Sequence, residues 1–139
     1  MKPIDRTLGF INGIAVDRVP FHPILMRFAA RHAGVRYRDF CLSPAHKCMA
    51  NIRCAEDFRS DWVNTMSDPW AEAEAFGTVL SYPDDDLPKV ERHAIEEISD
   101  IDRMAVLRPG DHRRMLARVE EIETYRRESA GALFICGWV

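Results

Sequence analysis

Apolar segments separated by long helical segments limit the folds that this chain can adopt. The segments 21–26, 60–67 and 132–139 are predicted strands, and the first and last have the near-continuous apolar character of strands buried on both faces. The connections between them are long enough for the helical crossovers that join parallel strands. The pattern therefore predicts an α/β fold made of parallel β/α units.

Local signals predict further elements around these strands. Ser43 is a candidate N-cap and Pro44 a first helical residue, which together predict a helix over 44–58. Apolar residues at core spacing predict another helix over 111–130, with Asp111 as its cap. The remaining predicted elements are helices over 4–14, from 27 to 34, over 70–77 and over 91–106, a short strand over 78–82, and a surface loop over 83–88.

Composition excludes several classes of function. The 139 residues suffice for one domain with one core, and 19 basic and 22 acidic residues are mixed along the chain with a net charge of −3. This pattern lacks the basic footprint of a nucleic-acid-binding protein. No apolar run is long enough for a membrane helix, and the N-terminus lacks the features of a signal peptide. We therefore expect a cytoplasmic protein whose cysteines are free thiols, namely Cys41, Cys48, Cys54 and Cys136.

Charged residues follow the first two predicted strands. Arg27 lies at the carboxyl end of the first strand and Asp68 at that of the second. Functional groups gather at this end of parallel β/α folds. Arg31 is four residues after Arg27, so on a helix the two side chains differ by about 40° in direction. Two guanidinium groups at a pocket mouth can each bind one oxyanion of a polycarboxylate or phosphate ligand.

The same residues also have plain structural explanations. Arg31 can lie on a solvated helix face, and Arg27 can extend its charged end to water. Asp68 can cap the helix that begins near Pro69. Spacing alone favours these structural explanations for the two arginines.

Two stretches resemble motifs of the uroporphyrinogen decarboxylase superfamily. "VPFHPILMRFAARH" is similar to its N-terminal signature R-Q-A-G-R-Y, with Arg27 and Arg31 as the two arginines and Ala29 between them. "SDWVNTMSDPWAEAEAFG" is similar to its second strand, which ends in Ser-Asp, here with Asp68. "RVP" before the first strand and "GALFICGWV" at the third fit in order, so the resemblance covers essentially the whole chain.

This resemblance implies roles for the matched residues. In the decarboxylases the two arginines hold acidic side chains of a porphyrinogen, which assigns substrate binding to Arg27 and Arg31. The aspartate faces the pyrrole N–H groups, which assigns catalysis to Asp68, and no metal or organic cofactor is used. His32, in place of the signature tyrosine, is grouped with the substrate-binding residues. A carboxylate at this position can stabilise positive charge on a protonated pyrrole.

Departures from the signature keep a second branch open. Phe28, Ala30 and His32 stand where the decarboxylase signature has glutamine, glycine and tyrosine. The superfamily also includes corrinoid-dependent methyltransferases, which relax this signature and often use zinc. His46 and Cys48 match the His-x-Cys pattern of a zinc motif in that branch. They lie two apart in a predicted helix and point about 200° away from each other, so we expect no metal site there.

The resemblance also implies an incomplete TIM (β/α)₈ barrel. A full barrel takes roughly 250 residues, so residues 1–139 are expected to be one partial domain with about three β/α units. We expect no turnover by this chain alone. The expected partners are a tetrapyrrole or other polycarboxylate, and either a second copy of the chain or the missing C-terminal half. A non-enzymatic remnant that binds a tetrapyrrole or a partner chain is the alternative.

Overall fold

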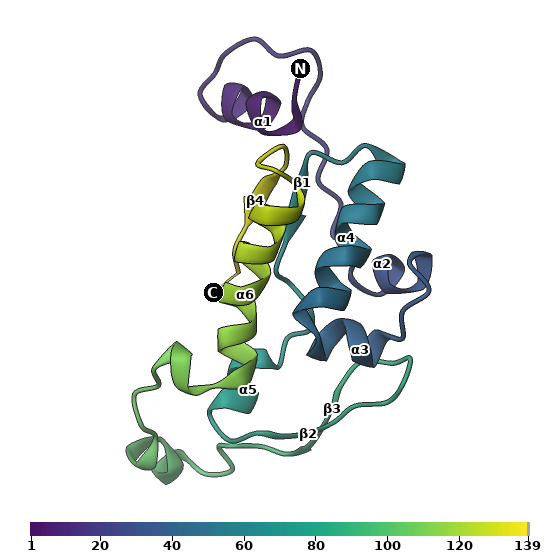
Figure 1. The fold of residues 1–139 in the computed structure, drawn as a ribbon. Helices are drawn as coiled ribbons and strands as arrows, with labels where there is room; N and C mark the ends of the chain where they lie inside the picture. The colour runs from purple at the N-terminus through teal and green to yellow at the C-terminus, as the bar shows by residue number, and fades with distance from the viewer. Residues whose placement is uncertain (139) are drawn as a thin grey trace.

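The computed structural model describes residues 1–138 and places a small parallel sheet next to two long helices (Figure 1). Strand β1 (Trp62–Asn64) pairs in parallel with β4 (Phe134–Cys136), with Val63 opposite Ile135. Both strands fall inside predicted strand segments, and their parallel pairing agrees with the predicted fold class. Val139, the last residue of the third predicted strand, lies outside the described residues.

The helices α4 (Pro44–Phe58) and α6 (Arg113–Glu128) pack against one face of this sheet. The predicted helix 44–58 is confirmed with its cap, because the Ser43 hydroxyl accepts a hydrogen bond from the backbone N–H of His46 at 3.4 Å. The predicted helix 111–130 is also confirmed. Its N-cap, however, is His112 rather than Asp111, which instead ends a short 3₁₀ turn, η2 (Pro109–Asp111).

Polar residues cross the interface between α4 and α6. The Lys47 ammonium lies 2.7 Å from the Glu121 carboxylate, and both side chains are almost fully buried. The Tyr125 hydroxyl donates to the backbone carbonyl of Asn64 at 2.9 Å and accepts from the Asn51 amide at 2.7 Å. These bonds tie both helices to β1, while Val63 and neighbouring apolar side chains fill the space between them.

The predicted strand Phe21–Met26 is wrong. These residues have no regular secondary structure up to Leu25, and α2 (Met26–His32) begins at the last of them. Pro20 and Pro23 have no backbone N–H to donate to a strand ladder. The backbone N–H of Asp61, the residue before β1, donates to the carbonyl of Phe21 at 2.8 Å.

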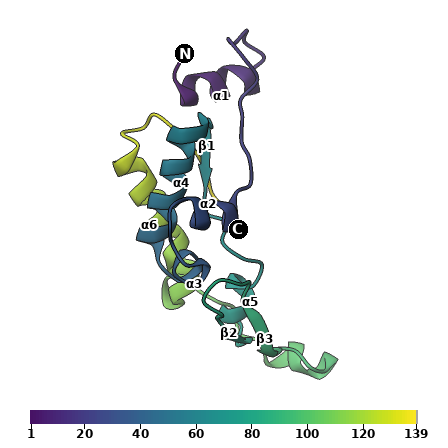
Figure 2. The same ribbon diagram turned by 90° about the vertical axis from the view of Figure 1, so that its right-hand side faces the viewer.

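Three further short helices lie outside the sheet and its two long helices. Helix α1 (Pro3–Ile11) lies near the amino ends of β1 and β4, at one end of the molecule (Figures 1 and 2). Helix α3 (Tyr37–Leu42), which the sequence did not predict, follows α2. Helix α5 (Ala71–Ala75) occupies the predicted segment 70–77 beyond the carboxyl end of β1.

The predicted helix 91–106 is also wrong. Strand β2 (Val79–Ser81) pairs antiparallel with β3 (Lys89–Arg92), and the predicted loop 83–88 joins them. The pairing with β2 uses the backbone of residues that a helix would need. A capping box between Glu97 and Asp100 then starts a 3₁₀ helix, η1 (Ile98–Arg103).

The described residues therefore form a mixed α/β structure with two of the three predicted parallel strands. The sheet and its helices lie between α1 at one end and the β2–β3 hairpin with η1 at the other (Figures 1 and 2). None of the described helices is long and apolar enough to cross a membrane.

Candidate functional site

A cavity of about 300 Å³ lies where β1 and β4 end. Residues from the loops after both strands line it, together with residues from the starts of α2 and α5 and from α6. They are Met26, Met66, Asp68, Pro69, Glu72, Arg118 and Trp138. This is the carboxyl end of a parallel sheet, where β/α folds place their ligands.

Asp68 has its side chain fully buried beneath this cavity. One carboxylate oxygen accepts from the Ser67 hydroxyl at 2.8 Å and from the Arg114 guanidinium. The other accepts from the backbone N–H of Trp70 at 3.0 Å, in the turn that leads into α5. The aspartate therefore both shapes this turn and forms a buried ion pair with α6.

Arg114 was not identified from the sequence. It projects from the first turn of α6, and it also contacts the Glu74 carboxylate at 3.2 Å and the Tyr82 hydroxyl. Burial lowers the pKa of Arg114, but the charges of Asp68 and its other neighbours outweigh burial and raise the pKa above its usual value. Arg114 is thus a permanent cation beside Asp68.

Arg118 lies one turn further along α6 and was missed as well. Its guanidinium contacts the Glu72 carboxylate at 2.7 Å and donates to the backbone carbonyl of Trp138 at 3.1 Å. Its Nε is buried and has no hydrogen-bond partner. The one available signal was the spacing of the two arginines, which places both on one face of the predicted helix.

Arg27 points to the loop between β2 and β3. Its guanidinium lies 3.2 Å from the Asp86 carboxylate and also donates to the backbone carbonyl of Asp85. Weaker ion pairs join Asp84 of the same loop to Arg36 and Arg38. The exposed acidic loop therefore pairs with Arg27, Arg36 and Arg38.

Arg31 and His32 lie apart from the cavity lining. Arg31 is exposed on α2. The His32 ring lies 2.7 Å from the Asp57 carboxylate and stacks on Phe28, and Phe58 contacts both rings. Of the four residues that the sequence singled out, Asp68 is therefore the one that lines the cavity.

Tyr37 is bonded to the residue that precedes Asp68. Its buried hydroxyl donates to the backbone carbonyl of Ser67 at 2.5 Å. Burial is the main cause that raises the pKa of Tyr37. The charge of Asp68 raises it further and the charge of Arg27 lowers it. The Tyr37 hydroxyl therefore helps to hold the loop after β1 immediately before Asp68.

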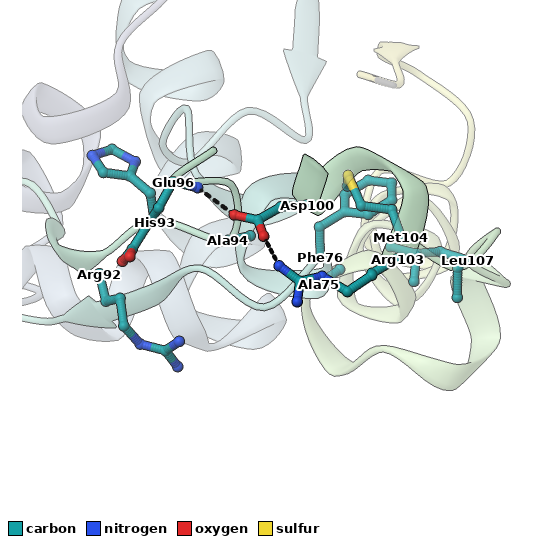
Figure 3. Close-up of a pocket in the computed structure, with 11 residues that line it drawn as sticks. Ala75, Phe76, Arg92, His93, Ala94, Glu96, Asp100, Arg103, Met104 and Leu107 are labelled. Atoms are coloured by element: carbon teal, nitrogen blue, oxygen red, sulfur yellow. Dashed lines mark hydrogen bonds and ion pairs between the residues drawn. The ribbon is translucent and has the colours of Figure 1, made fainter. Parts of the chain in front are cut away.

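A second hollow of about 440 Å³ is formed by other elements, between the end of α5, the residues after β3, and η1 (Figure 3). Asp100 lies at its centre and accepts hydrogen bonds from the backbone of Glu96 at 2.9 Å and from Arg103. Backbone hydrogen bonds from Glu97 and Glu96 and the Arg103 bond lower the pKa of Asp100 to about 2. Asp100 and Arg103 therefore pair with each other, and the backbone bonds to Asp100 hold the start of η1 in place.

No group of three His, Cys, Asp or Glu side chains that could hold a metal ion occurs among residues 1–138. His46 is exposed on α4, whereas Cys48 is buried and its thiol contacts the carbonyl of Glu121 at 3.6 Å. The two side chains therefore diverge as the helical spacing predicted.

These features define an α/β protein with a ligand-sized cavity at the carboxyl ends of parallel strands. The family model for uroporphyrinogen decarboxylase (URO-D) matches residues 2–139, and the chain belongs to this family, as the sequence motifs predicted. No curated protein matches the chain. A solved methyltransferase from Methanosarcina mazei has a similar fold, with a TM-score of 0.72 and 16% sequence identity. The similarity covers 99% of this chain and 42% of the methyltransferase, so the chain spans less than half of that structure.

Proposed function

We propose that this chain forms the first part of a tetrapyrrole-binding site in an enzyme of the uroporphyrinogen decarboxylase superfamily. The observation that carries the proposal is the position of Asp68. The residue that matches the superfamily's aspartate lines a cavity at the carboxyl end of β1, next to Trp138 from the end of β4. Porphyrinogens and corrinoids are both tetrapyrroles, so this assignment holds for either branch of the superfamily.

The cavity can hold one edge of such a ligand. Its volume of about 300 Å³ is at the lower limit of small-molecule pockets, and a tetrapyrrole is much larger. Met26, Met66 and Trp138 supply an apolar lining that fits the edge of a macrocycle, while Arg118 supplies a positive charge. The rest of the macrocycle would have to contact further β/α units.

Of the two reactions, we favour corrinoid-dependent methyl transfer over decarboxylation. A decarboxylase needs its aspartate free to stabilise positive charge on a pyrrole. Here the Asp68 charge is compensated by the buried Arg114 guanidinium, and its oxygens accept three hydrogen bonds. The fold similarity to a methyltransferase is consistent with this choice.

In the methyltransferase, a bound corrinoid would supply the centre that carries the methyl group. The residues of this chain would orient it: Met26 and Trp138 by packing against its edge, and Arg118 by binding a peripheral polar group. Asp68, paired with Arg114, would hold the turn into α5 in place.

Decarboxylation is the second candidate, and the match of the uroporphyrinogen decarboxylase family model to residues 2–139 favours it. Arg27 and Asp68 match the decarboxylase's substrate-binding arginine and its aspartate. A small movement of the loop over 83–88 would free Arg27 to bind a substrate carboxylate near Asp68.

Absorbance titrations of the chain with methylcobalamin and with coproporphyrin test this proposal. We expect both tetrapyrroles to bind, and we expect methylcobalamin to lose its methyl group when a thiol acceptor and the rest of the barrel are supplied. Loss of carboxyl groups from uroporphyrinogen, followed by mass spectrometry, would favour the second candidate instead. Failure of both tetrapyrroles to bind would contradict the proposal.

A further inference from the structure

Among the described residues, Arg118 is the one cation that lines the cavity at the ends of β1 and β4. Its side chain is 14% exposed, although it reaches from the middle of α6 to the end of the sheet. Arg27 and Arg31, the arginines of the superfamily signature, lie outside this lining. The positive charge inside the cavity therefore comes from a residue outside the superfamily signature.

The bonding of Arg118 is incomplete. Glu72 contacts one of its terminal nitrogens, and the carbonyl of Trp138 accepts from the other. The buried Nε has no partner. A guanidinium can bind both oxygens of a carboxylate with two parallel N–H groups, so the contact with Glu72 uses half of what this side chain offers.

Glu72 is an exchangeable partner. Its side chain is 41% exposed, and it belongs to α5, which has five residues. Exposed carboxylates lose little free energy when they leave an ion pair for water. Asp68, the other carboxylate of the lining, cannot take its place because Arg114 already binds it.

The remaining lining is apolar and is held in place. Met26, Met66, Pro69 and Trp138 surround the charged group. Met26 has a left-handed backbone conformation with φ of 34°, which is unfavourable for a residue with a side chain and occurs often at ligand sites. A ligand that has an apolar body and an anionic group at one edge would match this arrangement of lining residues.

We propose that Arg118 binds a carboxylate on the edge of an apolar ligand by displacing Glu72, and that it thereby determines ligand specificity. This inference rests on the proposed tetrapyrrole-binding site and bears on the choice between its two candidate reactions, because porphyrinogens carry peripheral carboxylates whereas methylcobalamin carries peripheral amides. The inference differs from what the superfamily signature implies, because the signature assigns carboxylate binding to Arg27 and Arg31.

Calorimetric titration of the 139-residue chain with 1-naphthoate and its neutral isostere 1-naphthamide tests the inference. Both probes are small enough for the cavity, and they differ in charge. We expect the carboxylate to bind at least about 10-fold more tightly than the amide, as for a charge-assisted hydrogen bond. Arg118→Gln should remove this preference, and Glu72→Gln should increase it.

The matched control is Arg113→Gln, since Arg113 lies on the same helix and pairs with Glu120 at the surface. It should leave the preference unchanged. Glu72→Gln keeps Arg118 and so tests the inference even if Arg118→Gln fails to fold. Equal binding of the two probes by the unmodified chain, or no gain in Glu72→Gln, would overturn the inference. Preference for naphthoate without any tetrapyrrole binding would support it and refute the proposed function.

Discussion

At the scale of single residues, Asp68 is the position where structural and functional explanations meet. Capping and ligand binding were alternatives in the sequence, and the structure shows that the carboxylate accepts from the backbone of the turn into α5. Its buried ion pair with Arg114 could not be foreseen, because the arginine is 46 residues away along the chain. Asp68 therefore has a structural role that any test of function must take into account.

Replacement of Asp68 by asparagine should destabilise the fold. The substitution removes the buried carboxylate partner of the Arg114 guanidinium, which is 10% exposed, and leaves it with the partly exposed carboxylate of Glu74. Loss of one partner of a buried ion pair costs about 3–5 kcal/mol. Glu120→Gln is the control, because it breaks the exposed pair with Arg113 and should cost less than about 1 kcal/mol. Denaturant unfolding measures both, and equal midpoints for the two variants would contradict the prediction.

The cysteines should differ strongly in reactivity. Burial is the main cause that raises the pKa of Cys41 and of Cys48 to about 12. At pH 8 a thiol of pKa 12 is ionised to a fraction of about 10⁻⁴, and the thiolate is the reactive form. Cys136 is partly exposed in β4 and should react first with iodoacetamide.

Mass spectrometry of the labelled chain at pH 8 checks this order. Raising the pH toward 10 should speed the labelling of Cys41 and Cys48 about 10-fold per unit, as long as the chain stays folded. Labelling in denaturant, where all thiols are accessible, is the control. Labelling of the two buried cysteines as fast as Cys136 in the folded chain would show that the packing of α3 and α4 is different from that described.

At the scale of elements, the helix that depends on local sequence signals was predicted correctly. The strand pairing that depends on contacts between separate segments was not. The helix 44–58 was predictable because Ser43 and Pro44 determine its start within a few residues. The predicted helix 91–106 failed because β3 pairs with β2, which is a contact that no local pattern reveals. The predicted strand 21–26 failed although its composition is apolar, because Pro23 within it and Pro20 before it have no N–H for ladder bonds.

The same distinction applies to the candidate site. The position of Asp68 after β1 follows from the strand pattern, and its place at the cavity was therefore predictable. Arg114 and Arg118 come from a helix that is distant in sequence, and their partners are fixed by the packing of α6 against α5. Which face of a helix meets a given loop depends on tertiary structure.

The ion pair between α4 and α6 allows a test at this scale. Burial is the main cause that lowers the pKa of Lys47 and raises that of Glu121, so each charge depends on the other. Lys47→Met should cost about 3–5 kcal/mol, whereas Lys47→Met combined with Glu121→Leu should be near neutral or stabilising.

Unfolding experiments from pH 7 to pH 5 refine this prediction. In Lys47→Met the Glu121 carboxyl is buried without its cation, so protonation relieves the penalty and the deficit should shrink as the pH falls. The double variant lacks both groups and should show no such dependence. A deficit that stays constant or grows toward pH 5 would show that Glu121 is not held in the buried pair.

At the scale of the whole molecule, the sheet is covered on one face. Val63 and Ile135 pack against α4 and α6. On the other side, Trp62 stacks with His22 and contacts Phe134, with ring centroids 4.6 Å apart in each pair, and these side chains are partly exposed. Parallel sheets are normally covered on both faces.

We therefore predict that the chain associates through this face and the edge of β4, either with a second copy or with a chain that carries further β/α units. Sedimentation at micromolar concentration should show a species larger than 16 kDa. Phe134→Asp, which puts a charge on the uncovered face, should shift the distribution toward the monomer. A stable 16 kDa monomer with slow amide exchange along β4 would contradict this prediction.

Amide hydrogen exchange, with and without coproporphyrin or methylcobalamin, tests most directly whether the cavity at the ends of β1 and β4 is the ligand site. The account predicts slower exchange at the amides of Met66, Trp70 and Trp138 and at the start of α2, because these backbone groups border the cavity. It predicts unchanged exchange in η1, which lines the separate hollow shown in Figure 3. Protection that appeared around η1, or on the outer faces of α4 and α6, without any change at the ends of β1 and β4 would contradict it.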